Sequence, residues 1–303
     1  MISTTDAQAR CGRLIDLALG AGADAADAVF EANASQSVTV RLGELEDVER
    51  SEGEEIGLRV FLGNRSATIS TSEFSDAGFR EMAERAVAMA GLAPEDPYAG
   101  LAPEKMLAVG SLPDLDLTDP TEPTPLDIKQ RAMAAEDAAR SIDGVTNSNG
   151  ASAGFTRGIS ALVTSHGFAG AREGTSHSLS ASMIAGEGDA MQRDYDFRVA
   201  RHLADLPSAE SIGSRAGERS VARLNPGTLL SGSMPVVFDP RVGGSLVSHL
   251  LGAMNGMAVA RRSSFLIDHL EDDLFAASIR ILDDPHRPRA PRSRPFDGEG
   301  LPT

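Results

Sequence analysis

The apolar positions near the N-terminus recur at helical spacing, and the pattern then changes to alternation. The helical spacing predicts a helix that begins at Thr5 and ends at Gly20–Gly22, with an apolar face of Ala9, Leu14, Ile15, Ala18 and Leu19. Alternating segments rich in β-branched residues predict an antiparallel meander over Ala28–Ala32, Ser37–Leu42, Leu45–Ser51, Ile56–Leu62 and Ser66–Ser72. A second helix over Ser75–Ala90 completes an N-terminal α+β domain, which we place at residues 1–93.

The chain then loses this periodicity and recovers it in a second region. Seven prolines and repeated acidic residues between Pro94 and Pro125 are typical of an extended connector, residues 94–124. Pro125 stands at the first-turn position that proline favours and predicts a helix to Ile142. A central β-rich domain, residues 125–225, is expected to hold a second antiparallel sheet and a further helix, built from Gly154–Ser165, Ser176–Ile184, Met191–Arg201 and Pro207–Arg223.

Residues 230–303 are expected to be the opening part of a β-rich C-terminal domain. They begin with a short apolar strand, Met234–Phe238, and a helix over Gly243–Val259 that is apolar on nearly all sides. The final Pro-rich and Gly-rich residues offer nothing to bury. We therefore expect poor stability beyond about residue 230 and first proteolytic cuts between Asn225 and the C-terminus. The fold class predicted for the whole chain is α+β.

Composition narrows the classes of partner and compartment. Forty-four acidic residues against 28 Lys and Arg give a net charge of −16, which disfavours phosphate backbones and anionic lipid as direct ligands. Cys11 is the only cysteine, so this chain has no disulfide framework and no cysteine metal cluster, as expected in a reducing compartment. We find neither an uninterrupted signal-peptide core nor a membrane-length apolar run, and we predict a cytoplasmic protein without a membrane partner.

Few residues carry a recognisable chemistry. The six histidines show no helical metal-ligand spacing, and His166, His177 and His202 are predicted to be satisfied surface or edge residues. Ser248 and His249 are adjacent, so on a helix their side chains point about 100° apart and cannot form a nucleophile–base pair. The spacings in this chain therefore give no catalytic residue.

Two charged stretches each allow a binding interpretation and a structural one. Arg261, Arg262, Ser263 and Ser264 could contact a substrate carboxylate or another anion, or they could form a solvated helix C-terminus where cations complement the dipole. The acidic run Glu44–Glu55 could bind a cation, but its spacing favours the exposed face of a hairpin.

Several longer stretches carry a family pattern that no short motif shows. They are EEIGLRVFLGNRSATIST, AERAVAMAGLAPEDPYAGLA, MQRDYDFRVARHLADL and MPVVFDPRVGGSLVSHLLGAMNGMAVARRSSFLIDHLEDDL, followed by RPFDGEGLPT. In this order, over nearly the whole chain, they resemble the TldD/PmbA family, and within it the PmbA (TldE) branch. The family continues well beyond the motif at Phe296–Gly300, so the resemblance implies a C-terminally truncated member, either a fragment or a truncated paralogue.

The resemblance also implies a function. The complex formed by members of the resembled family is a cytoplasmic TldD–TldE heterodimeric metalloprotease that cleaves unfolded proteins and peptides in an enclosed chamber. The zinc belongs to the TldD branch, whose helix carries His-Glu-x-x-x-His. The matching ligand positions here are Ser248 and Ala253, with His249 at the general-base position, and a shift by one residue gives Val247 and Gly252. Serine is a poor zinc ligand, and alanine, valine and glycine have no ligand atom in their side chains. The resemblance therefore implies a subunit without its own zinc site.

The expected role is therefore a non-catalytic subunit that forms chamber wall and substrate-binding surface, paired with a TldD-type chain that carries zinc. No cofactor is expected in this chain. One alternative is a stand-alone peptide-binding or regulatory module without a protease partner. A self-sufficient hydrolase would need a nucleophile–base pair that the sequence does not show.

Overall fold

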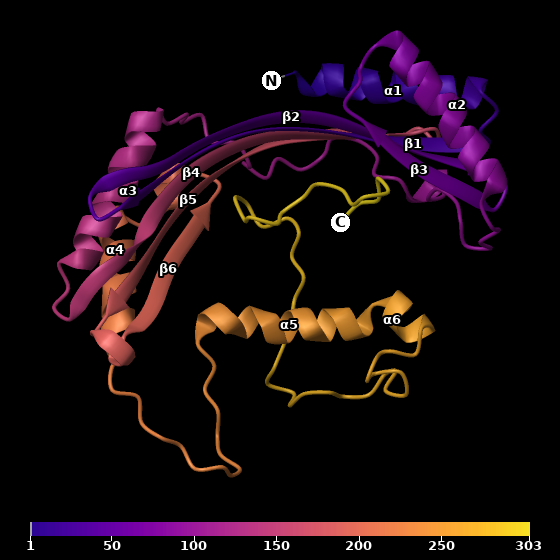
Figure 1. The fold of residues 1–303 in the computed structure, drawn as a ribbon. Coiled ribbons are helices and arrows are strands. Elements are labelled where there is room, and N and C mark those ends of the chain that lie inside the picture. Colours follow the sequence, from indigo (N-terminus) through magenta and orange to yellow (C-terminus); the bar gives the residue numbers. More distant parts are fainter. Residues whose placement is uncertain (1) are drawn as a thin grey trace. The chain divides into compact units, whose positions relative to one another are not determined.

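The computed structural model describes residues 2–303, which divide into two compact units. The first unit contains the chain up to Pro226 together with Asp284–Thr303, and the second is Gly227–Asp283. An antiparallel sheet forms the first unit, with the strand order β3-β2-β1-β4-β5-β6 (Figure 1). Its strands are β1 (Ala25–Arg41), β2 (Glu44–Leu62), β3 (Arg65–Thr71), β4 (Val145–Thr164), β5 (Ala169–Ala185) and β6 (Gln192–Ala200). Its helices are α1 (Thr4–Gly20), α2 (Asp76–Leu92), α3 (Pro125–Arg140) and α4 (Ala209–Ala222), with the 3-10 turns η1 (Glu104–Met106), η2 (Gly188–Ala190) and η3 (Leu203–Asp205).

The expected second sheet is wrong, and so is the division of the N-terminal region into five short strands. β1 pairs with β2 along one edge and with β4 along the other, so strands from both predicted domains join one sheet. The polar stretch 33–36, which separated two predicted strands, lies inside β1 and keeps both sets of partners. Polar residues do not break a strand whose middle is exposed to water, so the hydrophobic pattern alone divided this long strand incorrectly.

Both helix pairs pack on the same face of this sheet, near its two ends. One core contains α1, α2 and the large side chains Phe30, Ile56, Leu58 and Phe79, all at most 2 % exposed. The other contains α3, α4 and Val40, Leu179, Met183 and Ile212. In Figure 1 the sheet of this unit arches, and the helices lie on the outer side of the arch. We call this the covered face and the opposite one the open face.

A buried carboxylate fixes the turn between β1 and β2. Leu42 and Gly43 both have positive φ, 54° and 81°, as a two-residue hairpin turn of the type I′ class requires. The Glu136 side chain of α3 is fully buried and accepts hydrogen bonds of 2.8 Å from the backbone N–H of each turn residue. The hairpin tip is thereby held against the second helix pair.

The C-terminal tail corrects another expectation, because it has something to bury. Phe296 is 7 % exposed and meets Phe168 at a ring-centroid distance of 5.0 Å. A backbone hydrogen bond of 2.8 Å joins Ala108 of the connector to Gly300 of the tail. The connector is also anchored, since Leu117 accepts a hydrogen bond from the backbone N–H of Thr175 in β5. Connector and tail therefore pack together on the sheet of the first unit.

The second unit contains α5 (Pro240–Met254) and α6 (Gly256–Ala260). The predicted single helix is interrupted at Asn255, whose side chain caps α6 by accepting a hydrogen bond from the backbone N–H of Met257. The predicted strand Met234–Phe238 is not a strand in the structure. Large apolar side chains of this unit are exposed, Val237 at 96 % and Leu251 at 56 %. No helix in the described part of the chain has the length and apolar character needed to cross a membrane.

Limited trypsin digestion should therefore make its first cuts within Gly227–Asp283. This segment holds the exposed Arg261, Arg262 and Arg280, whereas residues 2–226 form a continuous hydrogen-bonded sheet with buried cores. Mass spectrometry of the early fragments checks this expectation. First cuts inside residues 2–93, with residues 230–282 still intact, would contradict it.

Candidate functional site

The open face of the sheet is lined by small and polar side chains. Its central row across β1, β4 and β5 pairs Asn33 with Gly158 and Gly158 with Gly174, and the next row pairs Ser35, Thr156 and Ser176 in the same way. Successive residues of a strand point to opposite faces, so these positions share the open face, while Phe155 and Leu179 lie on the covered face. A surface of this kind leaves strand backbones close to any bound chain.

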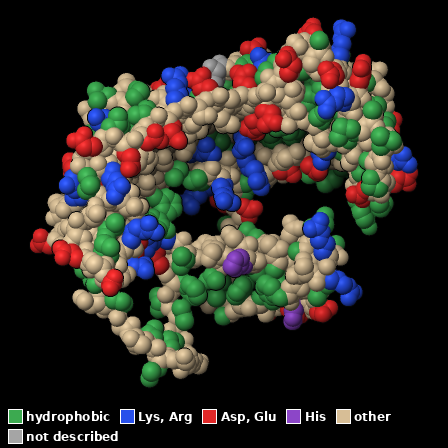
Figure 2. All heavy atoms as spheres, in the orientation of Figure 1, with side chains coloured by type: hydrophobic (Ala, Val, Ile, Leu, Met, Phe, Trp, Pro, Cys, Tyr) green, Lys and Arg blue, Asp and Glu red, His purple; other side chains and the backbone are tan. Residues whose placement is uncertain are grey.

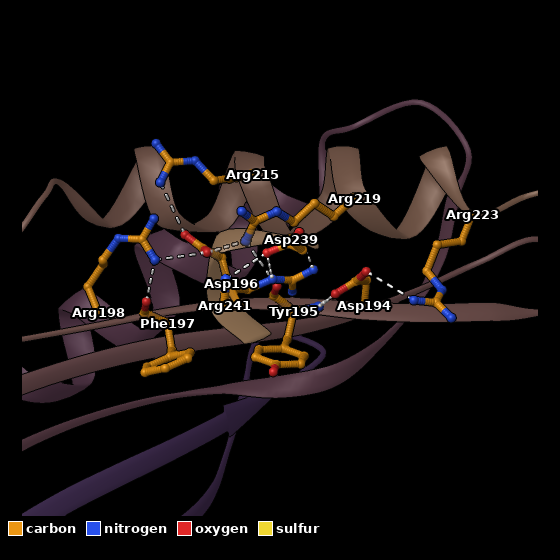
Figure 3. A network of polar contacts seen from close by, with 10 residues as sticks. All are labelled: Asp194, Tyr195, Asp196, Phe197, Arg198, Arg215, Arg219, Arg223, Asp239 and Arg241. Atoms are coloured by element: carbon orange, nitrogen blue, oxygen red, sulfur yellow. Dashed lines mark hydrogen bonds and ion pairs between the residues drawn. The ribbon is translucent and has the colours of Figure 1, made fainter. Parts of the chain in front are cut away.

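An aromatic pair lies on the open face at the sheet edge, on β6. Tyr195 and Phe197 are 46 % and 47 % exposed, and their rings stack with centroids 6.1 Å apart. They lie opposite Ser182 and Ser180 of β5. Figure 3 shows both rings pointing away from α4, while Asp194 and Asp196 point toward it. β6 thus presents aromatic surface on one side and acidic anchors on the other.

The anchor is a network of carboxylates and guanidinium groups between β6 and α4 (Figure 3). Asp196 is fully buried and forms ion pairs with Arg198 at 3.1 Å, with Arg215 at 3.4 Å and with Arg219. Asp194 pairs with Arg223 at 3.5 Å. Arg215, Arg219 and Arg223 recur every four residues and so share one face of α4. This network is absent from the sequence-based predictions, although the spacing of these arginines and the Asp-x-Asp alternation of β6 could have indicated it.

A buried acid–histidine pair ties the connector to β5. His177 and His202, predicted to be satisfied surface or edge residues, are 1 % and 7 % exposed, so a surface position is wrong for both. The Nε2 atom of His177 lies 3.0 Å from Asp119 of the connector. Burial lowers the pKa of His177, and this effect is larger than the opposite effect of the negative charge on Asp119, which raises the pKa. Burial alone would raise the pKa of Asp119, but hydrogen bonds from the N–H groups of Leu203 and Thr121 outweigh it and lower this pKa to about 2.

His166 is partly buried and its Nδ1 lies 3.0 Å from the carbonyl oxygen of Ala102 in the connector. This contact satisfies one ring nitrogen through a neutral backbone group. Like the His177 pair, it fastens the connector to the sheet rather than forming a reactive pair.

Ser248, His249 and Ala253, which the resemblance places at the zinc-motif positions, lie on α5. Ser248 and His249 are exposed, and the Ser248 hydroxyl donates a 3.0 Å hydrogen bond to the carbonyl oxygen of Gly244 one turn back. Ala253 is 8 % exposed and has only a methyl side chain. An imidazole-type ligand set is therefore missing from these positions, and the shifted register of Val247 and Gly252 supplies no ligand atom either. Across residues 2–303 we find no group of three or more His, Cys, Asp or Glu side chains placed to hold a metal ion.

The Arg261–Ser264 stretch lies at the end of α6. The Ser263 hydroxyl donates to the carbonyl oxygen of Ala258 at 3.2 Å, and the buried Ser264 hydroxyl donates to that of Ala253 at 2.7 Å. Arg262 has a positive φ of 54°. Both hydroxyl protons therefore satisfy helix carbonyl groups, an arrangement that favours the helix-terminus interpretation over an anion site.

Comparison with known proteins covers nearly the whole chain. Models of the PmbA/TldA metallopeptidase match in three parts, domain 1 at residues 26–90, the central domain at 118–224 and the C-terminal domain at 231–303. Metalloprotease PmbA of Escherichia coli O157:H7 and the PmbA homologue of Haemophilus influenzae are each 34 % identical over 95 % of the chain. The chain spans 64 % of the length of each of these relatives.

Solved structures show the same fold. A Bacteroides thetaiotaomicron protein, named as a candidate modulator of DNA gyrase, matches all of this chain and 69 % of its own, with a TM-score of 0.92 and 26 % identity. TldE from Thermococcus kodakarensis matches 96 % of this chain and 65 % of its own, with a TM-score of 0.74 and 19 % identity.

Proposed function

Because this chain belongs to the PmbA/TldD metallopeptidase family, we propose that it is a non-catalytic subunit of a TldD–TldE type metalloprotease. In this proposal the zinc is held by a homologous TldD-type subunit, and this chain supplies chamber wall and substrate-binding surface in the cytoplasm. The substrates are unfolded proteins and peptides.

The observation that carries the proposal is the side-chain chemistry of α5. A zinc peptidase site needs three protein ligands and a bound water, and the ligands are usually His, Cys, Asp or Glu. Ala253 offers no lone pair, and the Ser248 hydroxyl proton is already directed to the Gly244 carbonyl. His249 would stand where the family pattern has a general base, but with no metal ligand beside it the position has no water to activate.

The open face supports the second half of the proposal. A peptide that binds without sequence preference is best held through its backbone and by broad apolar contacts, because these groups recur in every peptide. The small residues of the central rows allow close approach of a chain, and the Tyr195–Phe197 pair provides apolar area at the edge. The net charge of −16 disfavours nucleic acid as a direct partner.

Co-expression with a TldD-type chain tests the proposal. We expect native mass spectrometry to show a heterodimer in preference to homodimers, and we expect peptidase activity and about one zinc per heterodimer only in the mixed sample. Altering the His-Glu-x-x-x-His ligands of the TldD-type chain should remove both, while Ser248→Ala and His249→Ala in this chain should leave zinc content unchanged.

Two outcomes would replace this proposal by another. Peptide binding by a chain that never pairs with a TldD-type subunit would favour a stand-alone peptide-binding or regulatory module. Stoichiometric zinc and peptidase activity in the isolated chain would show that it carries its own catalytic site.

A further inference from the structure

A hollow of about 170 Å³ lies in the open face of the first unit. Its lining includes Glu31, Asn33, Gly158, Arg172, Gly174 and Arg201. All of these residues belong to the first unit, on β1, β4, β5 and the segment that follows β6. Figure 2 shows basic side chains gathered beneath the middle of the arch.

Two glycines make room for the side chains that shape this hollow. Gly158 and Gly174 are directly paired across β4 and β5. A Cβ atom on Gly174 would lie 2.9 Å from the Nη1 atom of Arg201, and one on Gly158 would lie 2.6 Å from the Oδ1 atom of Asn33. Any larger residue at either position would displace these groups, so the glycines let Arg201 and Asn33 lie close against the sheet.

Arg201 is held in place by neutral groups only. Its Nη1 donates a 3.2 Å hydrogen bond to the carbonyl oxygen of Thr175, and its Nη2 donates a 2.7 Å bond to that of Pro291 in the tail. Its Nε is buried and has no hydrogen-bond partner in the described structure. Burial and the nearby charge of Arg172 lower the pKa of Arg201, so its charged form lacks compensation.

Arg172 is exposed at the rim and adds a second cation. Among residues 2–303, no carboxylate forms an ion pair with Arg172 or Arg201. The acidic groups nearby are already directed elsewhere, since Glu173 pairs with Arg157 and Glu31 accepts a 2.7 Å hydrogen bond from the Ser160 hydroxyl. Arg172 and Arg201 are therefore two nearby cations at one hollow without an acidic partner, and an external anion would neutralise them.

We propose that this hollow binds a carboxylate group of a peptide, between the guanidinium groups of Arg172 and Arg201. Glu31 lies on the β1 side of the same hollow, and its Oε2 atom, which takes no part in the Ser160 hydrogen bond, can accept an N–H of the same peptide. The inference rests on the proposed function in one respect, that the open face meets peptides. The carboxylate comes from the C-terminus of the peptide or from an acidic side chain.

Titration of the chain alone, without any protease partner, tests this site. The probes are acetyl-tetra-alanine with a free carboxylate, its C-terminal amide, and an amidated peptide of the same length that contains one glutamate. Isothermal titration calorimetry at low salt should detect the free carboxylate and show no binding of the all-alanine amide. Binding of the glutamate peptide would show that a side-chain carboxylate also enters, and its failure to bind would restrict the site to C-termini.

Variants separate the site from general electrostatics. Arg172→Gln should weaken binding by roughly 10- to 100-fold, as expected for loss of a charged hydrogen-bond donor, and it should leave the fold intact because Arg172 is exposed. Gly174→Ala should weaken binding by displacing Arg201 without changing charge. Arg193→Gln, an exposed arginine at the far end of β6 that does not line the hollow, is the matched control and should bind as the parent chain does.

Equal binding of the carboxylate and amide peptides, unchanged affinity in Arg172→Gln, or no binding by any probe would each overturn the proposal. None of these results bears on pairing with a TldD-type chain, which is measured separately by native mass spectrometry. The two proposals can therefore fail independently.

Discussion

Replacing Gly213 by alanine should destabilise the first unit by about 3 kcal/mol. Gly213 of α4 faces α3, and a Cβ atom there would lie 2.0 Å from the carbonyl oxygen of Ala135. Backbone cannot rotate away as a side chain can, so α3 and α4 would have to separate. Their separation would loosen the core that they form with Leu179 and Met183 of β5. Urea unfolding followed by circular dichroism measures the change in the free energy of unfolding.

The matched control is Gly12→Ala in α1, where an added Cβ meets nothing within 4 Å. Alanine is the better helix former by about 1 kcal/mol, so Gly12→Ala should stabilise the chain slightly. Gly217→Ala should behave like Gly213→Ala, since its Cβ would lie 2.7 Å from the carbonyl oxygen of Ala139. Parent-like stability of Gly213→Ala would show that the two helices are not packed as closely as the structure has them.

The sequence predicts the helices of the first unit well because each carries local signals. Ser75 and Thr124 cap α2 and α3 with their side chains, and Pro125 occupies the first turn, as its fixed φ favours. The strands were less predictable. The apolar alternation is strongest where a helix pair covers the sheet and fades in the exposed middle of β1, so one strand is interpreted as two.

The candidate site depends on contacts between distant parts of the chain, which no local pattern encodes. Asp119 and His177 are separated by 58 positions, and Arg201 meets Pro291 of the tail across 90. Gly174 lies inside β5, where its missing side chain accommodates Arg201, and no local pattern marks this role. Residue types alone predict that α5 lacks zinc ligands, because this prediction needs only the side-chain chemistry of Ser248 and Ala253.

Replacing Asp196 by alanine should destabilise the first unit by about 3 to 5 kcal/mol, the range expected when one partner of a buried ion-pair network is removed. Asp196 is fully buried, and Arg198, Arg215 and Arg219 all direct charge at it. Without the carboxylate, these guanidinium groups repel one another at the interface of β6 and α4. Asp196→Asn should cost less, because the amide keeps the shape and one acceptor oxygen.

The loss of stability in Asp196→Ala should be largest in β6. This strand lies at the edge of the sheet, and apart from its contact with α4 it is held only by pairing with β5. Hydrogen exchange of the β6 amides should therefore increase more than that of β1 amides, whose strand is paired on both sides. Asp189→Asn, an exposed acid just before β6, controls for the loss of one negative charge and should change stability by less than about 0.5 kcal/mol. If Asp196→Ala matches this control, the network adds no net stability. If Asp196→Ala destabilises β6 selectively, the aromatic pair on the opposite side of the strand depends on the Asp196 network for its position. The peptide contacts proposed for Tyr195 and Phe197 should then weaken together with the fold of that edge.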